Sequence, residues 1–366
     1  MPIEQASLLQ ELLSAYAPCG REEAVRAVCE RELAPLVDET WTDPAGNLVG
    51  LVRGAGAGSG GEPGGRAGGA APVVRVMAHM DELSMIVKRV EDDGTLRVEQ
   101  LGVMYPGNFG LGPVAVLGDE RELTGILTLG SEHTTAETTR VWETKPDQGD
   151  KAMDWSHVHV FTGLSAQELA AAGVHPGTRV CVHRSKRTLV ELGEHVGSWF
   201  MDDRALITVA LTAARLLREG GRRPAADVYF VFTTSEEMGG VGASYAARVL
   251  PGDVTLALDV GPAEAEYRTA VDEAPIVAYA DAAVVYDVGV ADHLCRLGAE
   301  LGLPPTPAVF SSFESDASQA KSKGLSAQAA LLCLPTLSTH GYEVVHARAI
   351  GNCARLLAAY LHRPVP

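Results

Sequence analysis

The chain has 366 residues, of which 46% are hydrophobic and 21% charged, so it can bury a sizeable core and form a second domain. Its formal net charge is −17 and its pI is about 5.1, which argues against a nucleic-acid partner and against binding to anionic membranes. No run reaches the roughly 18 apolar residues of a membrane span, and residues 1–10 lack a leader pattern, so we expect a cytoplasmic protein.

Two amphipathic helices are predicted at the start of the chain, over residues 7–17 and 22–36, because apolar residues recur there at intervals of three and four. A turn at 43–47 and a short strand at 48–52 follow. Residues 53–72 are rich in glycine and alanine, which cannot bury a hydrophobic face. We therefore expect a disordered loop between two strands.

The pattern changes between residues 88 and 195 to short β-like runs separated by turns. The runs are 96–101, 114–117, 122–129, 158–162 and 179–184, with one helix expected at 165–172 and an exposed loop at 131–156. His157 and His159 have the spacing of one strand face, and we interpret them as sheet-surface residues rather than ligands. This segment predicts an inserted β-rich domain.

Alternating helices and strands return after residue 197. Helices are expected at 203–217, 243–247, 289–301 and 347–362, and strands at 227–232, 254–258 and 328–334. The sequence therefore predicts a three-layer α/β/α domain built from residues 1–87 and 196–366, interrupted by the β-rich domain of residues 88–195.

Polar side chains follow four apolar runs of the α/β part, where strands are expected to end. They are His79 and Asp81 after 73–78, Glu236 and Glu237 after 227–232, Asp259 after 254–258, and His340 shortly after 329–334. Such ends meet at one sheet edge, where ligands bind. A lone Glu-Glu pair is typical of a solvated surface, but the repetition favours a site. Imidazole and carboxylate ligands together suit zinc, cobalt or manganese.

Other polar residues have simpler interpretations. Asp202 and Asp203 precede a helical segment, where an acidic cap is expected, and Asp203 and Arg204 are most simply a helix cap and an ion pair. Asp316 is interpreted as a capping or supporting residue rather than a ligand. His346 competes with His340 as a ligand, but we place it at the start of the last helix. The six cysteines show no Cys-x-x-Cys spacing and are interpreted as reduced packing residues.

Six motifs, in this order, resemble the M42 metallo-aminopeptidases, also called TET aminopeptidases. They are His79-Met80-Asp81-Glu82, Asp202-Asp203-Arg204, Glu236-Glu237-Met238-Gly239 with Gly242-Ala243, Leu258-Asp259, Ser315-Asp316-Ala317, and Pro335-Thr336 with Thr339-His340. The resemblance covers nearly the whole chain, including the inserted β-rich segment. It implies a barrel-like dimerisation domain inserted into a di-metal exopeptidase domain.

The resemblance also implies a centre of two divalent metal ions, zinc or cobalt. Asp202 would bridge both ions, His79 and Asp259 would bind one of them, and Glu237 and His340 the other. Glu236 would remain free as the general base, because a carboxylate whose lone pairs are engaged cannot easily accept a proton. Asp81, two residues after His79 on an extended strand, points the same way and can orient the imidazole.

The function implied is removal of amino-terminal residues from short peptides by a homo-oligomer, with dimers assembling into a dodecamer. The segment 336–343 departs from the family pattern of Thr-Arg-Tyr before the last histidine, which leaves the preferred side chain open, as well as a dedicated small peptide-like substrate. Three alternatives stay open. They are a related metal carboxypeptidase or deacylase, a metal-independent glycoside hydrolase built on Glu236 and Glu237, and a catalytically silent scaffold.

Overall fold

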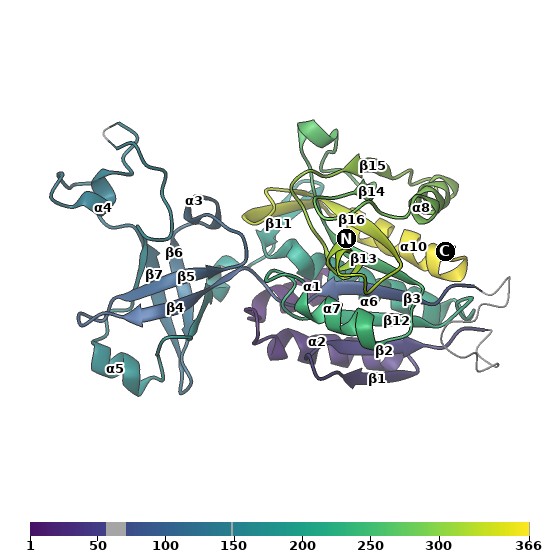
Figure 1. Ribbon diagram of the computed structural model, residues 1–366, viewed down its shortest axis with the longest axis horizontal. Coiled ribbons are helices and arrows are strands. Elements are labelled where there is room, and N and C mark those ends of the chain that lie inside the picture. Colours follow the sequence, from purple (N-terminus) through teal and green to yellow (C-terminus); the bar gives the residue numbers. More distant parts are fainter. Residues whose placement is uncertain (56–70, 148, 366) are drawn as a thin grey trace.

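The structure is a computed structural model and describes residues 1–55, 71–147 and 149–365. Figure 1 shows a six-stranded barrel on one side and a larger α/β part on the other. The loop predicted at 53–72 falls mostly outside the described residues. Within the described ranges, none of the helices is long and apolar enough to cross a membrane.

The α/β part is built on a mixed sheet of eleven strands within the described residues, with central order β1-β2-β12-β3-β13-β16-β17-β11-β10. Strand β14 pairs with β16, and β15 pairs with β14. The strands are β1 Glu39–Thr42, β2 Leu48–Val52, β3 Val74–His79, β10 Val190–Leu192, β11 His195–Trp199, β12 Val228–Thr233, β13 Val254–Pro262, β14 Ile276–Ala280, β15 Thr306–Val309, β16 Gln328–Leu337 and β17 Tyr342–His346. Strands β12, β3, β13 and β16 are parallel neighbours, so their carboxyl ends lie at one edge.

Helices cover both faces of this sheet (Figure 1). One face packs against α1 Ile3–Ser14, α2 Glu23–Leu33, α6 Met201–Glu219, α8 Val288–Glu300 and α10 Ala349–His362, and the other against α7 Val241–Val249 and α9 Asp316–Ser322. Alternate residues of β12 explain the two layers. Phe230 packs in the core with α6, whereas Val231 packs beside Ala246 of α7. The three-layer α/β/α prediction is confirmed.

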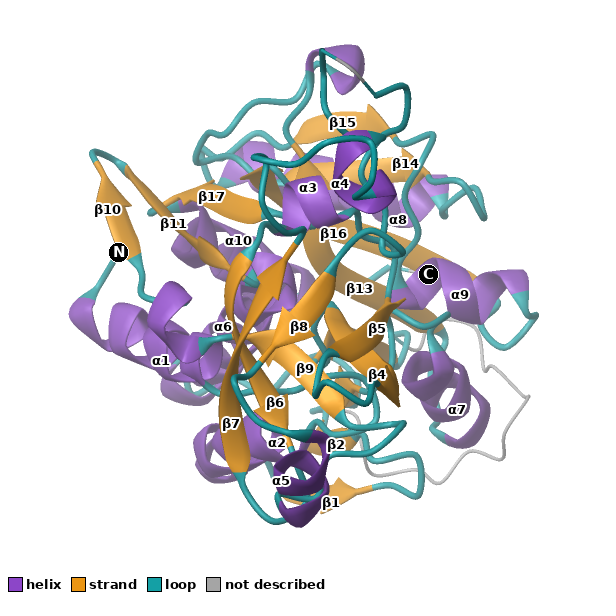
Figure 2. Ribbon diagram, turned by 90° about the vertical axis from the view of Figure 1, so that its left-hand side faces the viewer, coloured by secondary structure: helices purple, strands orange, loops and turns teal. Residues whose placement is uncertain are grey.

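The inserted segment forms a closed barrel with strand order β4-β5-β8-β7-β6-β9, seen towards the viewer in Figure 2. Its elements are β4 Ser84–Val90, β5 Leu96–Leu101, α3 Pro106–Phe109, β6 Gly112–Leu117, β7 Glu122–Thr128, α4 Thr139–Trp142, β8 His159–Phe161, α5 Ala166–Ala171 and β9 Arg179–Val182. Ser165 and Glu168 form a capping box at α5, as the predicted cap requires. The single turns α3 and α4 were missed because four residues show no helical period.

Two histidines lie elsewhere than predicted. His157 precedes β8, is only 2% exposed, and places its Nε2 atom 2.8 Å from Glu143, so it is not a sheet-surface residue paired with His159. His346 ends strand β17 instead of starting the last helix. Its ring stacks edge-on against His195 of the neighbouring strand β11. Both positions are decided by long-range contacts that local spacing does not contain.

A buried ion triad joins the barrel to the α/β part. Glu82, on the segment between β3 and β4, accepts hydrogen bonds from Arg187 at 2.6 Å and from Arg204 at 2.8 Å, and all three side chains are fully buried. Arg187 also donates to the carbonyl of Val182, the last residue of the barrel. The predicted ion pair of Arg204 is therefore formed, with Glu82 as its partner.

Replacing Glu82 with glutamine is expected to destabilise the protein by about 3–5 kcal/mol, because two buried guanidinium groups lose their counter-charge. Urea denaturation followed by circular dichroism measures the change. Glu99→Gln is the matched control, since Glu99 pairs with Lys88 on the surface and such pairs contribute little. Equal midpoints for the two variants would contradict the role of the triad.

Candidate metal centre

The parallel strands deliver most of the predicted site residues to one edge of the sheet. His79 is the last residue of β3 and pairs with Thr233, the last residue of β12. Glu236 and Glu237 follow Thr233 by three and four residues. Asp259 lies in β13, which runs parallel to β3. The parallel strands thus bring these groups to the same edge of the sheet.

Asp202, at the start of α6, lies at the centre of the cluster. Its Oδ1 atom is 2.8 Å from Nε2 of His79, and its Oδ2 atom is 3.6 Å from Nε2 of His340. The same His340 nitrogen is 3.8 Å from Oε2 of Glu237. The two oxygens of one carboxylate therefore face two different imidazoles.

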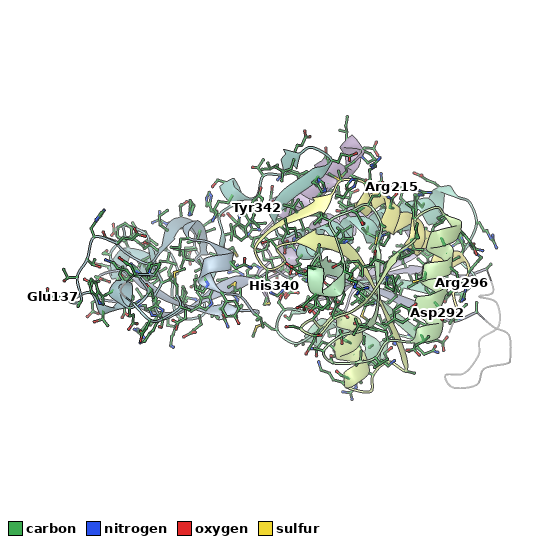
Figure 3. All side chains as sticks on the ribbon, turned by 90° about the horizontal axis from the view of Figure 1, so that it is seen from above. Glu137, Arg215, Asp292, Arg296, His340 and Tyr342 are labelled. Atoms are coloured by element: carbon green, nitrogen blue, oxygen red, sulfur yellow. The ribbon has the colours of Figure 1, made fainter. Side chains whose placement is uncertain are left out.

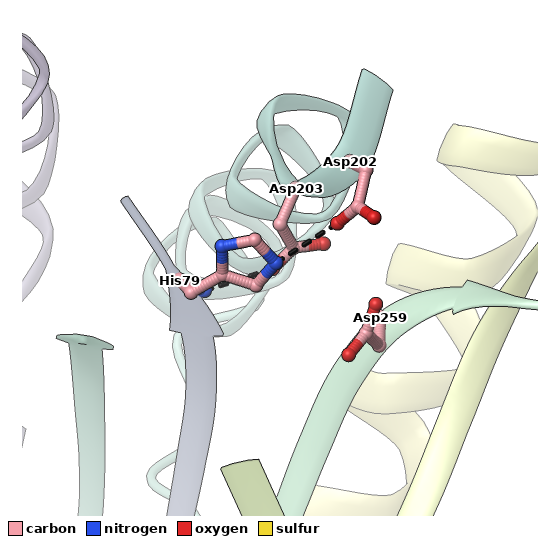
Figure 4. Close-up of side chains that lie close together, drawn as sticks. All are labelled: His79, Asp202, Asp203 and Asp259. Atoms are coloured by element: carbon pink, nitrogen blue, oxygen red, sulfur yellow. Dashed lines mark hydrogen bonds and ion pairs between the residues drawn. The ribbon is translucent and has the colours of Figure 1, made fainter. Parts of the chain in front are cut away.

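Within the described residues, two groups of side chains have ligand atoms that all lie within 4.8 Å of one another. The first group consists of His79, Asp202, Asp203 and Asp259 (Figure 4). The second group consists of Asp202, Glu237 and His340. Asp202 belongs to both groups. All five predicted ligands thus lie in these two groups, and the first group also contains Asp203, which was not predicted as a ligand.

Asp203 precedes the regular part of α6, as predicted, because Asp202 and Asp203 both have non-helical backbone angles. The peptide bond between them is cis. The Asp203 side chain does not act as the predicted helix cap. Asp203 Oδ2 accepts the main-chain N–H of His79 at 2.9 Å, while Oδ1 is buried without a hydrogen-bond partner among the described residues. Its only signal in the sequence was its position beside Asp202.

The cluster carries more negative than positive charge. Burial raises the pKa of Asp259 and of Glu237 well above the usual range, and the charge of Asp202 raises both further. Burial opposes protonation of His79, but its hydrogen bonds to Asp202 and Asp81 outweigh this and raise its pKa. Divalent cations would relieve the repulsion between these carboxylates. Buried carboxylate and imidazole donors, one of them an oxygen without a partner, fit such ions.

Asp81 links the end of β3 to the turn after β12. Its carboxylate accepts the main-chain N–H groups of Glu236 at 2.9 Å and of Glu237 at 3.2 Å. The Nδ1 atom of His79 lies 3.2 Å from the Asp81 carbonyl and 3.6 Å from its carboxylate. Asp81 therefore contacts the imidazole as expected, but its shorter carboxylate contacts hold the two glutamates.

All six cysteines lie in the described part of the chain and are free thiols. Cys19 does more than pack, because its Sγ atom lies 2.9 Å from Oδ2 of Asp81. Burial, together with the charge of Asp81, raises the pKa of the Cys19 thiol, so the thiol stays protonated and donates. Cys19 is thus part of the support behind Glu236 and Glu237.

Removing this donor has a measurable consequence. Cys19→Ala is expected to lower the free energy of unfolding by about 1 kcal/mol relative to Cys19→Ser, because both variants lack the sulfur but only serine keeps a hydrogen-bond donor for Asp81. Urea denaturation of the two metal-loaded variants measures the difference. Identical stabilities would show that the thiol only fills space.

Three other candidates lie outside the two groups. Glu236 is half-buried, and desolvation together with the charges of Asp316 and Glu237 raises its pKa. Asp316 begins α9 behind its cap Ser315 and accepts the hydroxyl of Thr233, which agrees with a supporting role. His346 lies in β17 against His195, away from both groups.

Glu343 is a site residue that the sequence analysis did not single out. Its Oε2 atom accepts the main-chain N–H of Asp202 at 3.0 Å, and Oε1 accepts that of His340 at 3.1 Å. Burial and the charge of Asp202 raise the pKa of Glu343 to about 8. One carboxyl group thus positions two members of the second group, and no local pattern marks it.

A small pocket opens beside the second group, with about 220 Å³ of empty space that includes open solvent. Besides Asp202, Glu237 and His340, its lining consists of Leu83, Phe109, Trp199, Phe200, Gly341 and Glu343. Phe109 comes from the inserted segment, whereas Trp199 and Phe200 come from the α/β part. The pocket is therefore lined by apolar side chains from both parts of the chain together with the candidate ligands of the second group.

Comparison with known proteins places the chain in a family. The sequence profile of the M42 glutamyl aminopeptidases matches residues 64–356. Lysyl aminopeptidase of Pyrococcus furiosus is 26% identical, over 98% of this chain and 97% of its own length. Aminopeptidase APDkam598 of Desulfurococcus kamchatkensis superposes with a TM-score of 0.85 at 25% identity, covering 98% and 94% of the two chains.

A further structure, the TET1 peptidase of Pyrococcus horikoshii, has a TM-score of 0.81 at 20% identity and covers 98% of this chain and 99% of its own. At that identity the likeness supports the fold alone. The match of the family profile over most of the chain carries the assignment: the chain belongs to the M42 glutamyl aminopeptidase family.

Proposed function

We propose that this metal-dependent aminopeptidase works with two divalent cations, zinc or cobalt, bound by the two groups that share Asp202. The observation that supports this most strongly is the orientation of the Asp202 carboxylate, whose two oxygens face His79 and His340. His79 and Asp259 would hold one cation, with Asp203 beside them. Glu237 and His340 would hold the other.

When bound, two such cations polarise the scissile carbonyl and acidify a water molecule. The remaining work falls to the protein. Glu236 belongs to neither ligand group, so its carboxylate is free to take the proton of the attacking water and return it to the departing amine. Asp81 fixes the turn from which Glu236 projects.

The substrate we propose is a short peptide with a free amino terminus. The test uses the full-length protein, with metal content measured by mass spectrometry on the same preparation. We expect turnover of aminoacyl anilides, loss of turnover with chelator, and about two ions per chain. Turnover restricted to amino-blocked substrates would instead indicate a carboxypeptidase or deacylase.

The glycoside hydrolase alternative finds less support. Glycosidases place two carboxylates on opposite sides of the sugar bond. Glu236 and Glu237 are adjacent, and their main-chain N–H groups both bind Asp81, so they leave the same turn. Hydrolysis of a glycoside that continues in the presence of a chelator would support this alternative.

We also propose that residues 88–195 serve assembly into a homo-oligomer in the cytoplasm, leaving residues 1–87 and 196–366 for catalysis. Ile126 and Phe161, paired neighbours on β7 and β8, are 40% and 58% exposed, which is typical of a surface that another subunit covers. The TET1 peptidase of Pyrococcus horikoshii can form a tetrahedron or a large octahedral shell. Light scattering gives the mass in solution, and a monomer would contradict the assembly.

The six free thiols support the proposed location in the cytoplasm, which is a reducing compartment.

A further inference from the structure

One segment of the inserted barrel reaches the second ligand group. It comprises residues 102–108, follows β5 and runs into α3, on the side of the barrel that faces the α/β part (Figure 1). Figure 3 shows His340 where the two parts meet, far from Glu137 at the outer end of the barrel. This positioning segment is distant in sequence from every predicted ligand.

The positioning segment holds His340 by its ring and by its main chain. The ring Nδ1 lies 2.6 Å from the carbonyl of Val103. Because a carbonyl only accepts, Nδ1 carries the proton, which leaves the Nε2 lone pair directed towards Asp202 and Glu237. Asn108 Nδ2 donates to the carbonyls of His340 at 3.1 Å and Thr339 at 3.4 Å.

The main-chain contacts are needed because His340 has a positive φ of 61°, a conformation that costs free energy in a residue with a side chain. Such a conformation persists only where its surroundings hold it. Asn108 supplies two hydrogen bonds from one side, and Glu343 accepts the His340 N–H from another. The ligand is thus held in place from both parts of the chain.

The same segment packs against Glu237. Gly102 has a φ of +92°, and its N–H donates to Sδ of Met238 at 3.2 Å. A Cβ atom at Gly102 would come within 3.3 Å of Glu237 Oε2 and 2.3 Å of Leu83 Cδ2. The close approach therefore requires glycine. Both ligands found only in the second group lie against residues of the inserted barrel.

The barrel fixes the segment in turn. Trp155 donates its indole N–H to the carbonyl of Met104 at 2.9 Å, and the rings of Phe109 and Trp155 pack 5.9 Å apart. The first group has different supports. His79 receives its contacts from Asp81, Asp202 and Asp203, and Asp259 accepts the N–H of Val260, all within the α/β part.

We infer that Gly102 and Asn108 are positioning residues for one of the two cations, the one assigned to Asp202, Glu237 and His340. The inference rests on the proposed two-ion centre. Disturbing the segment misplaces His340 and Glu237 but leaves His79, Asp203 and Asp259 untouched. One ion is therefore expected to bind about 10–100-fold more weakly, as when other supports of metal ligands are removed, while the other keeps its affinity.

The experiment titrates the metal-free protein with Zn²⁺ by calorimetry and measures retained zinc after dialysis. Asn108→Ala and Gly102→Ala are the test variants. Asn108→Ala only removes side-chain atoms, so it still tests the inference if Gly102→Ala does not fold. Asn352→Ala and Gly193→Ala are the matched controls. Asn352 also donates to a main-chain carbonyl, that of Glu273, and Gly193 has a positive φ with open space around it.

We expect wild type and controls to retain about two ions per chain, and the test variants about one, with unchanged circular dichroism spectra. Two unaltered affinities in Asn108→Ala would overturn the inference, as would equal weakening of both ions. A wild-type protein that binds a single ion would contradict the two-ion centre itself, so the two failures are distinguishable.

Discussion

Glu236→Gln is expected to lower kcat by about 100- to 10,000-fold while both cations stay bound, because the amide cannot take the proton of the attacking water. Glu236 belongs to neither ligand group, so its loss leaves every proposed ligand in place. Turnover of an aminoacyl anilide and metal content, measured on the same preparation, test both halves of the expectation.

Glu237→Gln is the matched control, since it changes the neighbouring residue in the same way but alters a proposed ligand. We expect that variant to retain less metal, which would separate the roles of the two glutamates. Near-wild-type turnover of Glu236→Gln would show that another group is the base.

Asp202→Asn is expected to lose both cations and, with them, all measurable turnover. A carboxylate offers an oxygen on each side, whereas an amide offers one oxygen and one NH₂ group that only donates. An asparagine at position 202 therefore cannot supply a ligand oxygen both to the group that contains His79 and to the group that contains His340. Metal content after dialysis and residual kcat measure the effect.

Asp316→Asn provides the comparison. Asp316 is buried near the same sheet edge but belongs to neither group within the described residues, so this variant is expected to keep both ions. Retention of two ions by Asp202→Asn would contradict the proposed bridging role. The two ions would then bind at separate sites that do not share Asp202.

Much of this architecture was predictable because its signals are local. The apolar runs before His79, Glu236 and Asp259 marked parallel strands. The first two strands end one residue beyond the predicted position, whereas β13 continues four residues further, to Pro262, and so includes Asp259. The strands β5 and β7 of the barrel were likewise marked by apolar runs between turns. Strands β11, β14 and β17 were missed. Their extended conformation depends on hydrogen bonds to neighbouring strands rather than on their own residue composition.

The sequence by itself determined the order of the elements and the polar residues that leave the strand ends, since both follow from residue type and short-range spacing. Only the tertiary structure decided which groups support those residues. Cys19 donates to Asp81, Glu343 accepts from Asp202, and Asn108 donates to His340 across separations of 62, 141 and 232 residues. Such contacts depend on how distant segments pack against each other. The residues next to a hydrogen-bonding side chain in the sequence do not indicate which distant group it will bind.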